Sequence, residues 1–127
     1  MKHFTIILAF LMTLSSPVAA QDLLKGFVAY WAGDFATALQ EWTPLAADVD
    51  GSRDVKYHLG LMYDNGDGVP QDNVMSHMWF NIASANGHTK AGEWRDERAG
   101  LMTPAAIEKA QAMARECMNS NYKKCGY

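Results

Sequence analysis

The sequence predicts an all-α protein: a short right-handed α-solenoid of helical hairpins, with about six helices and a closing hairpin at the C-terminus. Three observations predict this fold. Apolar residues recur at spacings of three and four, the helical period, along most of the chain. No segment alternates apolar and polar residues as a half-buried strand would. Two segments also repeat each other with a period in the mid-thirties, which is the length of a helical hairpin.

The repeat shows in matched residues. A Tyr, a Gly and an Asp recur after 33 residues, and a Trp recurs after 37 residues, in these pairs: Tyr30 and Tyr63, Gly33 and Gly66, Asp34 and Asp67, and Trp42 and Trp79. The difference of four residues corresponds to an insertion at 68–71. Because a large ring recurs at the Trp42 and Trp79 sites, both are predicted to be buried between helices.

The first 20 residues are predicted to be a cleaved signal peptide. Lys2 precedes an apolar run over 4–14, and small residues at 18–20 end at a typical cleavage site before Gln21. The apolar run has eleven residues, too few to span ~30 Å of hydrocarbon at ~1.5 Å per residue. We therefore expect a periplasmic or secreted protein whose repeat domain is 21–127, without stable membrane insertion of the mature chain.

The first hairpin is predicted over 23–32 and 35–47. Asp22 and Asp34 are the expected N-caps, because their carboxylates accept hydrogen bonds from the first free backbone N–H groups. Pro44 falls inside the second of these helices and should weaken it, at a cost of up to ~3 kcal/mol in a regular helix.

The second hairpin is predicted over 53–65 and 73–86, with Ser52 and Asp72 as N-caps. A glycine follows each helix, as expected where the chain turns through a left-handed residue.

The closing hairpin is predicted over 89–99 and 104–118. Thr103 is the expected cap of its second helix, and Pro104 occupies the first helical position, which favours proline.

The only two cysteines, Cys117 and Cys125, lie near the C-terminus. After export, two cysteines most simply pair with each other, and the short loop would stabilise the fold by ~2.5 kcal/mol. Zinc ligation and a redox pair are the alternatives. Zinc needs four ligands, and redox pairs usually have the Cys-x-x-Cys spacing, so a structural disulfide is favoured.

The stretch VKYHLGLMYDNGDGVPQDNVMSHMWFNIASANGHTKA, residues 55–91, resembles one Sel-one-like repeat, a family related to the tetratricopeptide repeats. The matching positions are Leu59, Gly60, Tyr63, Gly66, Gly68, Val69, Asp72, Trp79, Ala83, Gly87 and Ala91. The segment RDERAGLMTPAAIEKAQAMAREC resembles the closing hairpin of exported bacterial members. The resemblance implies stacked hairpins and adaptor or regulatory roles.

No motif indicates catalysis, a metal or a cofactor. In the glycine-rich loop around Gly66 and Gly68, a calcium-loop register places Tyr63 and Val74 at ligand positions, where neither can bind the ion. The histidines lack the spacing of a zinc motif. A pI of about 5.7 and a net charge of −3 argue against nucleic acid as a partner. We expect a protein that is not an enzyme and uses no cofactor.

Two functions remain. The favoured one is a protein–protein interaction or adaptor module, because stacked hairpins form a groove that suits a protein or peptide. The alternative is an envelope enzyme or small-ligand binder acting on cell-wall or β-lactam-like compounds, as the resemblance implies for some disulfide-rich relatives. The candidate partner-binding residues are Trp31, Lys56, His58 and Trp94. Trp31 and Trp94 are expected to be partly exposed, because their register positions hold Asp and His in the sister repeat. Packing on a chain end is the alternative for each.

Overall fold

A computed structural model describes residues 18–47 and 53–126 of the chain. Within these ranges it contains six α-helices, one short 3₁₀ helix and no strand, which confirms the predicted all-helical fold. Most of the predicted signal peptide lies outside the described residues, and Val18–Ala20 form the first turn of a helix.

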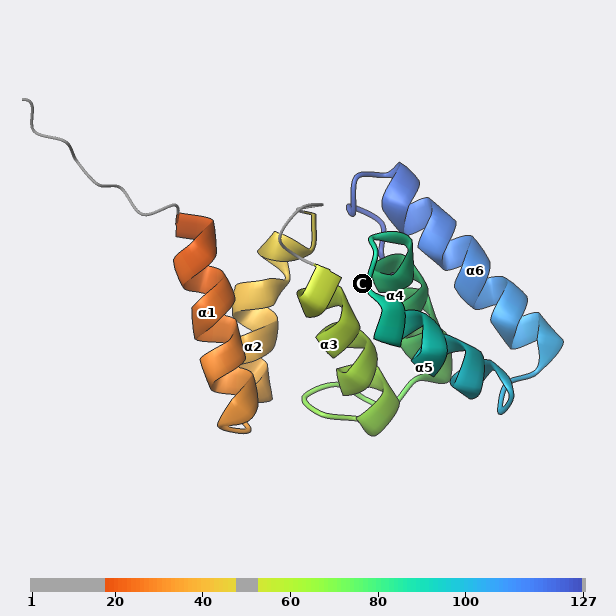
Figure 1. The fold of residues 1–127 in the computed structure, drawn as a ribbon, viewed down its shortest axis with the longest axis horizontal. Coiled ribbons are helices and arrows are strands. Elements are labelled where there is room, and N and C mark those ends of the chain that lie inside the picture. The colour runs from red at the N-terminus through yellow and green to blue at the C-terminus, as the bar shows by residue number, and fades with distance from the viewer. Residues whose placement is uncertain (1–17, 48–52, 127) are drawn as a thin grey trace, which may run out of the picture.

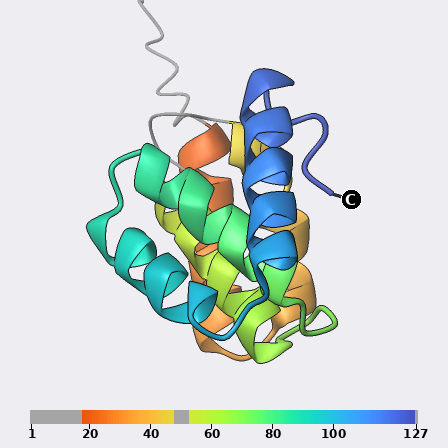
Figure 2. The same ribbon diagram turned by 90° about the vertical axis from the view of Figure 1, so that its right-hand side faces the viewer.

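The helices form hairpins that lie side by side in an elongated row (Figure 1). Helix α4 lies between α5 and α6, so the two helices of the predicted closing hairpin pack on α4 rather than against each other (Figure 2). The elements are α1 (Val18–Trp31), α2 (Phe35–Trp42), the 3₁₀ helix η1 (Pro44–Ala47), α3 (Arg53–Asn65), α4 (Asn73–Ala85), α5 (Thr89–Ala99) and α6 (Pro104–Asn119).

Three of the six α-helices begin at the side-chain caps that the sequence predicts. The side chain of Asp34 accepts a hydrogen bond from the Thr37 N–H at 3.2 Å, and Asp72 caps α4 in the same way. The Thr103 hydroxyl caps α6. The prediction for Asp22 is wrong: α1 already begins at Val18, so Asp22 lies inside the helix rather than at its start. Ser52 lies outside the described residues.

The prediction of one helix over 35–47 is wrong at its C-terminal end, because Pro44 does more than weaken the helix: α2 stops before it. The α-helix stops at Trp42, the Thr43 hydroxyl donates back to the Leu39 carbonyl at 2.7 Å, and the chain continues as η1. Proline has no N–H for the α-helical ladder, so the tighter 3₁₀ turn replaces the last turn of the predicted helix.

In both cores a large ring packs against a glycine of the neighbouring helix. Trp42 and Trp79 are both fully buried, which confirms their prediction. A Cβ atom at Gly26 would clash with the Trp42 ring, and one at Gly60 would lie 2.5 Å from the Phe80 ring. Glycine at these two sites therefore allows each pair of helices to approach closely.

The glycine-rich loop after α3 joins α3 to α4 within the second hairpin and also contacts the first hairpin. Gly66 and Gly68 have φ of 73° and 72°, in the left-handed region that favours glycine. A Cβ at Gly68 would lie 2.6 Å from that of Phe35 at the start of α2. The insertion thus reaches back onto the first hairpin. The other repeat positions agree with the expected packing: Leu59 and Ala83 are buried, Tyr63 is half-buried, and Gly87 has φ 96°.

The predicted disulfide between Cys117 and Cys125 is present, and both sulfurs lie in the main core. The bond closes the chain back on the end of α6. This C-terminal segment therefore belongs to the core rather than being a free tail.

The buried tryptophans give a stability prediction. Trp42→Ala and Trp79→Ala should each lower the free energy of unfolding by about 3–5 kcal/mol, because each leaves a large cavity. The matched control is Trp31→Ala, since Trp31 is 75% exposed and its loss leaves no cavity. Urea unfolding of all three variants measures the difference. An equal loss in Trp31→Ala and Trp42→Ala would contradict the proposed packing.

Candidate functional site

Aromatic rings from three helices surround His58 on α3. Their centroids lie between 4.9 and 6.1 Å from the imidazole, mostly in edge-to-face contacts. These rings and His58 are called the aromatic cluster. Its members are Phe27, Tyr30 and Trp31 of α1, Trp42 of α2, and Tyr57 and His58 of α3. The cluster joins the first hairpin to the second through side chains.

The backbone determines which nitrogen of His58 carries its proton. Nδ1 lies 2.7 Å from the Asp54 carbonyl oxygen, and a carbonyl can only accept, so Nδ1–H donates. Burial lowers the pKa of His58, and this outweighs the hydrogen bond to the Asp54 backbone, which raises it. At neutral pH the imidazole is therefore uncharged, with its Nε2 lone pair as an acceptor.

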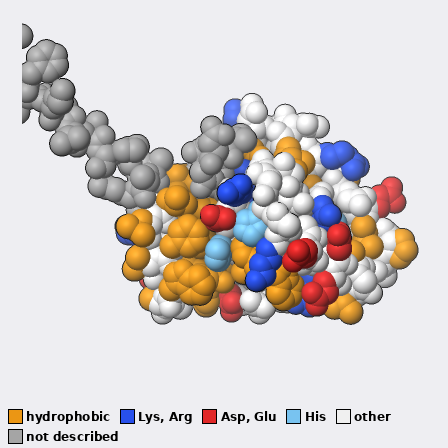
Figure 3. All heavy atoms as spheres, viewed as in Figure 1, with side chains coloured by type: hydrophobic (Ala, Val, Ile, Leu, Met, Phe, Trp, Pro, Cys, Tyr) orange, Lys and Arg blue, Asp and Glu red, His pale blue; other side chains and the backbone are white. Residues whose placement is uncertain are grey.

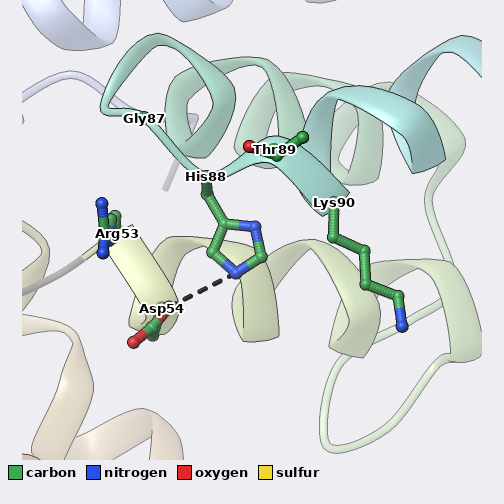
Figure 4. A pocket seen from close by; sticks show the side chains of 6 residues that line it. All are labelled: Arg53, Asp54, Gly87, His88, Thr89 and Lys90. Carbon is green, nitrogen blue, oxygen red and sulfur yellow. Dashed lines mark ion pairs between the residues drawn. The ribbon is translucent and has the colours of Figure 1, made fainter.

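His88 has the opposite tautomer. Its Nδ1 accepts the Ala91 N–H at 3.1 Å and so caps α5, which leaves the proton on Nε2. Nε2 in turn lies 3.3 Å from the Asp54 carboxylate, and the two groups point toward each other in Figure 4. The His88 ring also stacks on Tyr57 with centroids 4.3 Å apart. Asp54 and Tyr57 thus hold the start of α5 against α3.

A shallow pocket of about 280 Å³ lies beside this contact. Arg53 and Lys90 lie on opposite sides of the Asp54–His88 pair, and Gly87 and Thr89 complete the lining (Figure 4). Apart from Gly87 the lining residues have polar side chains, and they carry both signs of charge.

An apolar stripe runs along the outer side of α1. Leu24, Val28 and Trp31 are 65%, 62% and 75% exposed and follow the i, i+4, i+7 spacing of one helix face. These three residues are called the α1 stripe. Figure 3 shows hydrophobic side chains gathered over the first hairpin, next to histidine side chains. The stripe borders the aromatic cluster, since Trp31 belongs to both.

The structure separates the four predicted partner-binding residues. Trp31 is exposed, as predicted, and the His58 ring lies beside it. Trp94 is partly exposed, and its inner side packs on a small core with Phe80 while Arg98 lies 5.1 Å from its ring. The prediction for Lys56 is wrong: its side chain is fully buried, because it points inward from α3 rather than toward the face with His58.

Sequence reasoning missed the rest of this surface. The spacing of Leu24, Val28 and Trp31 was available as a signal, but nothing in the sequence shows that this face of α1 is uncovered. His88 was missed because histidine is an unusual N-cap, and its partner Asp54 lies 34 residues away.

Among the described residues, no group of three or more His, Cys, Asp or Glu side chains is placed to bind a metal ion. Across the same ranges, the helices are too short or too polar to cross a bilayer.

Comparisons with protein-family models, curated proteins and solved structures give no match to the chain. The surface must therefore be interpreted from its own geometry.

Two histidines whose pKa is lowered, the partly buried His58 and the buried His77, predict a pH dependence. Burial also lowers the pKa of His77, and the Arg95 charge lowers it further. As the pH falls below about 6.5, these histidines therefore bind protons in the unfolded chain before they do so in the folded protein. The free energy of unfolding falls until the pH reaches the lower pKa values of His58 and His77 in the folded protein. Above about 6.5 this contribution is fully present.

Urea titrations between pH 7.5 and 5 should show the free energy of unfolding falling with pH, by at most about 1.4 kcal/mol per pH unit for each histidine. His58→Phe should reduce this slope while leaving the contribution of His77. A stability that stays constant or rises as the pH falls would contradict the lowered pKa of the two imidazoles.

Proposed function

We propose that the protein binds a protein or peptide partner through the α1 stripe and the adjoining aromatic cluster. The observation that carries this proposal is the line of three large apolar side chains, each more than half exposed, on one face of α1. Contiguous exposed apolar surface on a small domain is typical of interaction sites. Tryptophan is a frequent anchor residue, because it offers a large apolar area with few rotatable bonds.

The repeat register supports the same conclusion. At the offset of 33, the α1 stripe corresponds to Tyr57, Leu61 and Asp64 on α3. Those three residues contact the segment of α5: Tyr57 stacks on His88, Leu61 packs in the small core, and Asp64 pairs with Arg98 at 2.9 Å. In the second hairpin, α5 covers this face of α3. The corresponding face of α1 in the first hairpin is exposed. A docked segment of a partner would complete it.

The family and the compartment belong to the same proposal. Hairpins of the predicted length, with left-handed glycines and buried tryptophans at matching positions, support membership of the Sel-one-like repeats. The buried disulfide is consistent with an oxidising compartment. The predicted signal peptide over 1–20 directs export in this proposal. We therefore propose a periplasmic or secreted interaction module without catalysis.

Partner capture tests the surface. The exported chain is immobilised, and proteins captured from the same compartment are quantified by mass spectrometry. Trp31→Ala should reduce capture of a saturable partner about tenfold or more, as expected for an anchor worth 1.4 kcal/mol or above. The thermal midpoint should change little, because Trp31 is 75% exposed.

The matched control is Leu101→Ala, since Leu101 is 74% exposed but lies between α5 and α6, away from the stripe. Its capture should equal that of the unmodified chain. Undiminished capture by a Leu24, Val28 and Trp31 triple alanine variant that remains folded would overturn the proposal.

Export gives a separate prediction. Intact-mass and peptide analysis of the exported protein should find Gln21 as the first residue and Cys117 joined to Cys125. Treatment with a reductant should add two hydrogen atoms to the mass. A chain that keeps residues 1–20, or that has two free thiols after export, would contradict the proposed route.

A further inference from the structure

Arg53 and Lys90 are two exposed basic residues that line the shallow pocket beside the aromatic cluster. They come from different helices, α3 and α5, and lie on opposite sides of the Asp54–His88 pair (Figure 4). The Arg53 guanidinium lies against Gly87, where a Cβ would be 3.5 Å from Nη1. The first turns of two helices therefore place one long basic side chain each at the same pocket.

The charge of this pocket is opposite to that of the whole chain. Its lining has two basic side chains and one carboxylate, that of Asp54, which lies 3.3 Å from Nε2 of His88. Within 18–47 and 53–126, neither Arg53 nor Lys90 forms an ion pair with a carboxylate. The chain as a whole has a net charge of −3. A local positive site on a negative protein attracts an acidic group to one place and so favours one orientation of docking.

A line of ring contacts connects the pocket to the α1 stripe. The centroids of Trp31 and His58 are 6.1 Å apart, and those of His58 and Tyr57 are 5.2 Å apart. Tyr57 in turn stacks on His88 at 4.3 Å, and His88 lines the pocket. Figure 3 shows hydrophobic, histidine and basic side chains next to one another on this face. The stripe and the pocket therefore belong to one surface across α1, α3 and α5.

We propose that this surface binds an extended segment of a partner protein that carries a large apolar side chain and an acidic side chain. At a rise of ~3.3 Å per residue, about four or five residues between the two side chains span the line of rings. The apolar side chain packs on Trp31. The N–H groups of Arg53 and Lys90 donate charge-assisted hydrogen bonds to the carboxylate in the pocket. This inference rests on the proposed function and adds the chemistry of the partner to it.

Selection from a random peptide library tests this chemistry without the natural partner. A phage library of short random peptides is panned against the exported full chain, and the recovered peptides are sequenced. They should be enriched in a large apolar residue with Asp or Glu at the proposed spacing. Panning against Trp31→Ala should remove the enrichment of the apolar residue.

A pair of variants matched in charge measures the contribution of the pocket. Arg53→Gln combined with Lys90→Gln should weaken the binding of an enriched peptide about fivefold in fluorescence polarisation, because exposed ion pairs are individually weak. Lys109→Gln combined with Arg115→Gln removes the same two charges from exposed sites on α6, on the other side of α4 from α5. This control should leave the affinity unchanged.

A change in the peptide completes the measurement. Replacing its acidic residue by the corresponding amide should weaken binding to the unmodified chain, but not to the variant that lacks Arg53 and Lys90. Added salt should likewise weaken binding of the acidic peptide to the unmodified chain more than to this variant, because salt screens exposed charges.

The outcomes separate this inference from the proposed function. Enriched peptides without an acidic residue, or an affinity that loss of Arg53 and Lys90 leaves unchanged, would overturn the acidic partner and leave the α1 stripe as a binding surface. If Trp31→Ala selects the same peptides as the unmodified chain, or if panning enriches no peptide, both proposals are contradicted.

Discussion

The closeness of the two helices in each of the first two hairpins determines the rest of this structure. In the first hairpin a glycine on α1 faces the Trp42 ring, and in the second Gly60 faces Phe80. A ring can pack against bare backbone only if no Cβ intervenes, so each glycine fixes how its two helices cross. The aromatic cluster depends on this geometry, because Trp42 reaches His58 only when α1 and α2 are close enough to bury it.

The aromatic cluster and the His88 contact join successive hairpins by different means. Between the first two hairpins the contact is made by ring edges and faces around a neutral imidazole. Between the second and third, polar pairs add to the packing: His88 with Asp54, Arg98 with Asp64, and Arg95 with Asn81. The first junction is therefore the more apolar one, and the exposed α1 stripe extends that apolar character to the surface.

Much of the fold could be predicted because helix ends are encoded locally. The predicted bounds of 53–65 and 89–99 agree with α3 and α5, where caps and glycines act within a few residues. The predicted cap at Asp22 is wrong because α1 begins four residues earlier, at Val18. The prediction for Lys56 is wrong because helical periodicity assigns a residue to a face of a helix but does not show what covers that face. Here the ring of Tyr122, 66 residues further along the chain, lies over Lys56. The α1 stripe and His88 were missed for the same reason: their environment is set by tertiary contacts.

The pairing of helices also has a kinetic consequence. In the described chain the extensive helix contacts join elements that are neighbours in sequence, apart from the contact between α4 and α6, which skips one helix. Such local contacts require little loop closure before they stabilise the chain, and helical domains of this kind fold in microseconds to milliseconds. Oxidation of Cys117 and Cys125 takes seconds or longer and closes only an eight-residue separation. The helices therefore form first, and covalent closure of the segment between Cys117 and Cys125 is the last step in maturation.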